Sequence, residues 1–212
     1  FGHSTSTNEP LYWYPTTTSK VMHTNTGIIG TMGTGKTQFT KGLIKQVHDN
    51  ARNNVNGNPI DILIFDYKGD YVKDDFVQAT NATVYDPYHL PYNPLALYKG
   101  KIPKPLLPLH TASSIQETIS TAFGLGPKQQ QLLNDVIMDA YRLSGIDKGN
   151  RATWDLTPPT FNNVYDRFIN HEGMKEDSLY AALKKIYDFE IFSPTSEGAH
   201  SLYNMVNGVT VI

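Results

Sequence analysis

The hydrophobic pattern of the first third of the chain alternates between strand-like and helix-like periods. Gly27–Ile29 is a short apolar run typical of a buried strand, and Ile60–Phe65 is apolar on both faces, like a parallel strand covered by helices. Between them, apolar residues recur at the spacing of one helix face: Phe39, Leu43, Ile44 and Val47. Shorter strands are expected at Leu11–Tyr14 and Thr83–Tyr85. The pattern predicts an α/β fold with a parallel sheet and a right-handed crossover.

The pattern changes after residue 86. Residues 87–108 hold six of the 13 prolines and three lysines, which predicts a surface segment with little regular structure. Four helical stripes follow, which we interpret as core-packing faces: Ile115 to Phe123, Leu132 to Tyr141, Phe161 to Phe168, and Leu179 to Ile186. The β-branched end, Val209–Ile212, predicts one more strand. We therefore expect a core with an N-terminal strand at 1–86, a proline-rich and helical insertion at 87–205, and a returning core strand at 206–212 in a domain that continues beyond the chain.

The short strand at 27–29 leads into a glycine-rich loop with the spacing G-x-x-x-x-G-K-[ST], which identifies a phosphate-binding loop. Glycines let backbone N–H groups approach phosphates, Lys36 supplies a charge for the β- and γ-phosphates, and Thr37 offers a hydroxyl to Mg²⁺. The candidate ATP-contacting residues are Gly30, Thr31, Met32, Gly33, Thr34, Gly35, Lys36, Thr37 and Gln38. A strand before the loop and an amphipathic helix after it favour this interpretation over a chance match.

Asp66 follows the strand at 60–65 and is the candidate carboxylate of the site, with Asp70 close behind it. Asp66 is a Mg²⁺ ligand if this strand lies beside the strand at 27–29. In a RecA-like order a further strand, missing here or built from 206–212, separates the two, and the Mg²⁺ carboxylate and catalytic Glu come later. No hydrophobic-Asp-Glu element occurs before Ile212. A third alternative is that Asp66 and Asp70 only shape the turn after the strand.

The amino-acid composition limits the classes of protein to which this chain can belong. The chain of 212 residues has 39% hydrophobic and 18% charged residues, ordinary values for a globular protein, and a net charge of −2, which gives no sign of a non-specific nucleic-acid binder. It has no cysteine, as is common in the reducing cytoplasm, and no apolar run approaches the ~20 residues of a membrane span. The seven histidines show no metal-ligand spacing, and Lys99, Lys101 and Lys104 are expected to be solvated.

Several segments carry a resemblance to a known superfamily. Asp66-Tyr67-Lys68-Gly69-Asp70-Tyr71, with Tyr67 in place of proline, is similar to the Asp-Pro-Lys-Gly-Glu/Asp element after the second core strand of the HerA/FtsK superfamily of P-loop motor ATPases. Pro10–Trp13 and the approach from His23 to Gly30 are similar to the strand and the run before the loop. With the stretch His89–Leu95, the overall likeness is to HerA-like ATPases of DNA phosphorothioation-dependent restriction systems.

The resemblance implies a RecA-like fold and a homo-hexameric ring that binds ATP and Mg²⁺ between its subunits. It further implies that the ring acts on DNA and works with partner restriction subunits. It also implies that the arginine finger comes from a neighbour, that Asp66 supports the γ-phosphate, and that the catalytic Glu lies outside these residues. We therefore expect Lys36 and Asp66 to be the catalytic residues present, and this chain alone to be a weak ATPase. A non-hydrolysing nucleotide-binding scaffold remains the alternative, and a kinase or GTPase is disfavoured because N-K-x-D is absent.

Overall fold

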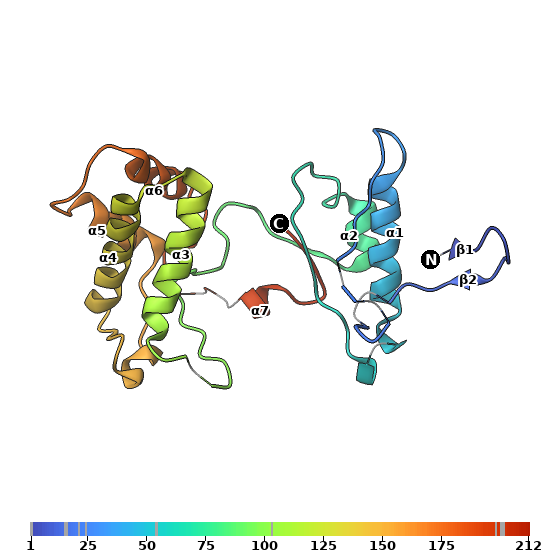
Figure 1. Ribbon diagram of the computed structural model, residues 1–212, viewed down its shortest axis with the longest axis horizontal. Coiled ribbons are helices and arrows are strands. Elements are labelled where there is room, and N and C mark those ends of the chain that lie inside the picture. Colours follow the sequence, from blue (N-terminus) through green and yellow to red (C-terminus); the bar gives the residue numbers. More distant parts are fainter. Residues whose placement is uncertain are drawn as a thin grey trace. The chain divides into compact units, whose positions relative to one another are not determined.

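The computed structural model describes residues 2–14, 17–20, 22–23, 25–53, 55–102, 104–197, 199 and 202–212. In chain order the elements are β1 (Gly2–His3), β2 (Pro10–Leu11), α1 (Lys36–Asp49), the 3₁₀ turns η1 (Ala51–Asn53) and η2 (Val55–Gly57), β3 (Ile62–Ile64), α2 (Asp74–Thr80), β4 (Thr83–Val84), α3 (Leu107–Phe123), α4 (Pro127–Leu143), η3 (Arg151–Asp155), α5 (Phe161–Ile169), α6 (Ser178–Asp188), α7 (Leu202–Met205) and β5 (Val209–Val211). Figure 1 labels β1, β2 and the helices α1–α7 along the ribbon. The predicted α/β class with a parallel sheet is confirmed.

The chain divides into two compact units, Phe1–Val84 with Gly208–Ile212, and Tyr85–Asn207. The predicted boundaries at 86 and 206 lie close to these, and the interpretation of the second unit as an insertion stays a prediction. Within the described residues, no helix combines the length and apolar character that crossing a membrane requires.

The first unit contains a parallel sheet in the order β3-β5-β4, so the last strand of the chain lies in the middle. Ile62 pairs with Val209 and Ile64 with Val211, while Thr83 pairs with Thr210 on the other side. All three residues of β5 are buried. A small core lies around the sheet, formed by Ile64, Phe76, Val209 and Val211 with the partly buried Ile44, Ile62, Tyr71 and Ala82. In β3, the residues on both faces are at least half-buried, which fits its run of three apolar residues without alternation.

The predicted strand at 27–29 is wrong for this structure. Residues 25–31 have no regular secondary structure, and the side chain of Ile29 is 97% exposed. A strand needs a hydrogen-bonded neighbour, and no described segment pairs with these residues. β5 pairs with β3 on one side and with β4 on the other, and residues 27–29 pair with none of these strands. The suggestion that a further strand, missing here or built from 206–212, separates 27–29 from β3 therefore stays a prediction.

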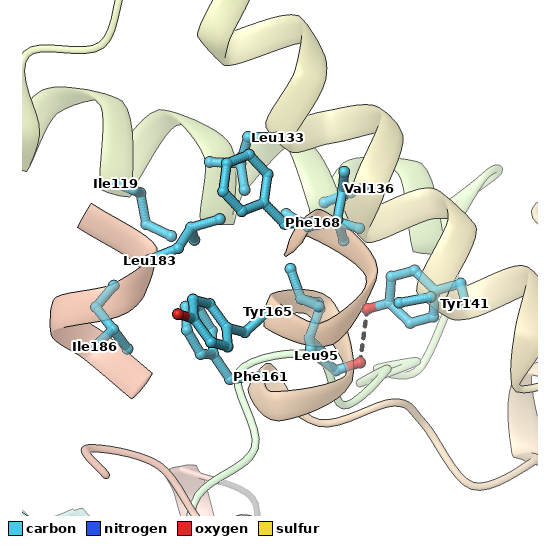
Figure 2. Packing of buried hydrophobic residues seen from close by; sticks show 14 of the residues in the cluster. Leu95, Ile119, Leu133, Val136, Tyr141, Phe161, Tyr165, Phe168, Leu183 and Ile186 are labelled. Atoms are coloured by element: carbon cyan, nitrogen blue, oxygen red, sulfur yellow. Dashed lines mark hydrogen bonds between the residues drawn. The ribbon is translucent and has the colours of Figure 1, made fainter. Parts of the chain in front are cut away.

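The second unit is helical. The four predicted stripes lie in α3, α4, α5 and α6, and their interpretation as core faces is confirmed by one buried cluster that includes Leu133, Val136, Phe168 and Leu183 (Figure 2). The same view shows the Tyr141 hydroxyl donating to the Leu95 carbonyl oxygen, at 2.6 Å. Burial raises the pKa of Tyr141. This contact anchors the proline-rich segment to α4, since both residues are buried.

Candidate nucleotide-binding site

The glycine-rich loop ends where α1 begins, at Lys36, as predicted. Gly33 and Gly35 have φ angles of +79° and +83°, in the left-handed region that side chains rarely adopt. Gly35 is the N-cap of α1, and no side chain caps the helix. The first-turn N–H groups of α1 are therefore directed out of the helix end without a side-chain acceptor, and the helix dipole adds partial positive charge there.

Within the loop, side-chain atoms of Thr34 and Lys36 lie close to Gly30 and to the Thr31 carbonyl oxygen. A Cβ added at Gly30 would lie 2.6 Å from the Thr34 hydroxyl oxygen, so this position excludes a side chain unless Thr34 moves. The Thr34 hydroxyl donates to the Thr31 carbonyl oxygen at 2.8 Å. The Lys36 ammonium donates to the same oxygen at 2.6 Å and so lies folded back over the loop.

The predicted loop residues are brought together in one place. Residues 30–35 and Gln38 are exposed, and Lys36 and Thr37 are half-buried at the start of α1. The arrangement fits a phosphate group, because it offers N–H groups, one ammonium and three threonine hydroxyls, with no acidic residue in the first turn of α1. No cluster of three or more His, Asp or Glu side chains forms a metal site among the described residues. A metal ion bound with the phosphates would take Thr37 as its ligand from the loop.

Asp66 has a different environment. Its backbone N–H donates to the Ile212 carbonyl oxygen at 2.9 Å, which continues the pairing of β3 with β5. Its carboxylate accepts from the N–H of Tyr71 at 2.7 Å and of Lys68 at 3.2 Å. Burial raises the pKa of Asp66, but the hydrogen bonds from its own turn outweigh burial, and the pKa is lowered. The turn-shaping alternative therefore describes what Asp66 does here, since both of its oxygens are engaged by the 67–71 turn.

Asp66 and Asp70 make no hydrogen bond or ion pair to residues 30–37 within the described part of the chain. Asp70 instead forms an ion pair of 3.4 Å with Lys73 on the surface. Their assignment to the nucleotide stays a prediction, as does that of residues 30–38.

One buried residue near the site could not be identified from the sequence pattern. Lys41 lies on α1 one turn after Thr37, and its side chain is only 8% exposed. Its ammonium lies 3.9 Å from the Asp75 carboxylate and about 5.5–5.9 Å from the ring centres of Phe76 and Tyr71. These contacts connect the helix after the loop to the segment after Asp66. A lysine in an amphipathic helix is usually expected in solvent, so the sequence gives no indication of such burial.

A glycine-rich loop that opens a helix, in a unit built on a parallel sheet, defines the class of P-loop α/β proteins. Residues 14–209 match the family model described as "Helicase HerA, central domain", and the chain belongs to this family. The predicted membership of the HerA/FtsK superfamily is confirmed; the likeness to restriction ATPases stays a prediction.

The fold is similar to that of VirB4 of Thermoanaerobacter pseudethanolicus, with a TM-score of 0.60 and 16% sequence identity. The matched region covers 86% of this chain and 47% of the VirB4 chain, so this chain spans about half the length of that protein. No match was found among curated proteins.

Proposed function

We propose that this chain is the ATP-binding part of a DNA-acting motor ATPase. The observation that carries the proposal is the exposed glycine loop before the uncapped start of α1, in a chain of the HerA central-domain family. At the finer level, we propose a homo-hexamer in a phosphorothioation-dependent restriction system, on the likeness of residues 23–40, 62–71 and 89–95.

Each loop residue has a proposed role. The N–H groups of 31–37 hold the phosphates, Lys36 turns from the Thr31 carbonyl toward the β- and γ-phosphates, and Thr37 ligates Mg²⁺. Mg²⁺ supplies positive charge that offsets the charge on the phosphates during transfer. Asp66 orders the 67–71 turn and supports the γ-phosphate through it. In the assembled protein, the general base and the arginine finger come from outside these residues, so this chain alone hydrolyses ATP slowly.

A non-hydrolysing nucleotide-binding scaffold is the second candidate. It is favoured by the engagement of both Asp66 carboxylate oxygens with the 67–71 turn, which leaves the loop without a carboxylate partner among the described residues.

Two measurements separate the candidates. ATP binding is measured by calorimetry with Mg²⁺ for the wild type and for Lys36→Ala, and phosphate release is measured for this chain and for the longer native protein, each with and without duplex DNA. The motor proposal predicts binding by both wild-type proteins, and DNA-stimulated release only by the longer one. Binding without release by the longer protein would support the scaffold. Absence of binding by either would overturn both.

A further inference from the structure

A long groove runs along α3 in the unit Tyr85–Asn207. Its volume is about 720 Å³, and it lies between α3 and the proline-rich segment that precedes it. The α3 residues that line it include Thr111, Ser114, Thr118 and Ala122, which follow one another at spacings of three and four. This spacing is one face of a helix, and the 17 residues of α3 extend over about 25 Å. The groove is therefore elongated and follows almost the whole helix.

The floor of the groove is apolar and fixed in place by the core. Ile119, Phe161 and Ile186 line it and come from three different helices, α3, α5 and α6 (Figure 2). All three are less than 10% exposed, because they also pack into the buried cluster. The groove is preformed by side chains that cannot move without disturbing the core.

One end of the groove is positively charged. Lys99 and Lys104 line it near the start of α3, and none of its described lining residues is acidic. Lys99 is already in an ion pair with Asp155, so Lys104 is the main cation facing an occupant. The first turn of α3 has no acidic residue, and its helix dipole adds partial positive charge at the same end.

We propose that this groove binds one amphipathic α-helix of a partner protein, with small or apolar residues against α3 and Asp or Glu beside Lys104. A helix matches the length of the groove, and the small side chains of Ser114, Thr118 and Ala122 allow two helix axes to approach within ~8–10 Å. An anionic small molecule would fill only part of this length. Nucleic acid requires a continuous basic surface, whereas this groove is apolar along its floor. The proposal is independent of the nucleotide-binding loop.

The test uses the 212-residue chain and two fluorescein-labelled 17-residue peptides. Both have the same Leu/Ala stripe at helical spacing, and the flanking positions are Glu in one and Lys in the other. Fluorescence anisotropy is expected to show micromolar binding of the Glu peptide and at least ~10-fold weaker binding of the Lys peptide. Equal affinities, or no binding of the Glu peptide, would overturn the proposal.

Substitutions on neighbouring positions of α3 locate the binding. Thr118→Trp fills the groove, and we expect ~10-fold or greater loss of affinity for the Glu peptide. Glu117→Trp is the matched control, because Glu117 is also exposed on α3 and does not line the groove. Lys104→Glu should reverse the preference between the two peptides. Circular dichroism of each variant verifies the fold.

Three other outcomes contradict the proposal. The first is a Thr118→Trp variant that binds as well as the control. The second is a duplex oligonucleotide that displaces the peptide from the wild type with higher affinity, which would assign the groove to nucleic acid. The third is a concentration-dependent dimer that only Thr118→Trp abolishes, which would assign it to a second copy of the chain.

Discussion

Lys36→Ala removes the only side-chain ammonium that contacts the glycine loop among the described residues. In the free protein this group donates one solvent-accessible hydrogen bond to the Thr31 carbonyl oxygen, so its loss should cost folding about 1 kcal/mol or less. In the complex it would make charge-assisted bonds to two phosphates, at ~1.5 kcal/mol or more each. The expected loss of binding free energy is about 3 kcal/mol, or roughly 150-fold in Kd.

This difference is measurable as ATP-dependent stability. ATP with Mg²⁺ at ~100 times the wild-type Kd should stabilise the wild type by ~2.7 kcal/mol and Lys36→Ala by only ~0.3 kcal/mol. The chain has two tryptophans, and Trp13 belongs to the unit with the loop. Urea unfolding followed by Trp13 fluorescence in a Trp154→Phe background therefore reports on that unit. Lys45→Ala is the matched control, because Lys45 lies on the same helix and, among the residues that the structure describes, its ammonium pairs with Asp49 alone. Equal ATP stabilisation of Lys36→Ala and the control would refute the assignment of the loop.

Gly30→Ala should weaken ATP binding at least ~10-fold, because the added Cβ would meet the Thr34 hydroxyl. The double variant Gly30→Ala with Thr34→Ala should recover much of the lost affinity for ATP. Calorimetry that shows no recovery in the double variant would contradict the steric argument. The pKa of Asp66 is lower in the folded than in the unfolded protein, so its ionised carboxylate stabilises the fold. This contribution is complete at pH values above the unfolded pKa of ~3.9 and is lost as the pH falls through the folded pKa. The stability advantage of wild type over Asp66→Asn should thus shrink between pH 6 and pH ~3 in urea unfolding, and a constant difference would speak against it. Tyr141→Phe leaves the buried Leu95 carbonyl without its hydrogen-bond donor and should lower the unfolding free energy of the helical unit by ~1–3 kcal/mol. Urea unfolding followed by Trp154 fluorescence measures this loss. An unchanged unfolding midpoint would mean that the hydrogen bond does not contribute to stability.

Features encoded by local spacing could be predicted from the sequence. The start of α1 at Lys36 follows from the glycine loop and the apolar face after it, and the four helices of the second unit follow from their stripes. The run at 27–29 could not be assigned correctly, because three apolar residues do not specify a partner strand. Non-local packing decided the remaining features. The burial of Lys41 depends on α2, and β5 lies between β3 and β4 through pairing that no local pattern encodes.

In the candidate site, too, local features could be predicted from the sequence and non-local ones could not. The loop residues are adjacent in sequence, so their convergence could be predicted from one motif. The environment of Asp66 depends on how the backbone of 67–71 turns, and three alternatives for its role were compatible with the sequence. The turn contacts form because Gly69, with a φ of +69°, lets the N–H groups of the turn converge on the carboxylate, and the role of Asp66 at the nucleotide stays a prediction.

The central position of β5 has a consequence for the order in which the protein folds. β3 and β4 pair with β5 and not with each other, so these three strands cannot come together until Val209–Val211 has been synthesised. The whole of Tyr85–Asn207 separates β4 from β5, and closing so long a loop before it is ordered is entropically slow. The helical unit has mostly local contacts and can fold first, during synthesis, which shortens the effective loop. The nucleotide-binding unit is then the last part of these residues to become native, and ATP would bind only after the helical unit has formed.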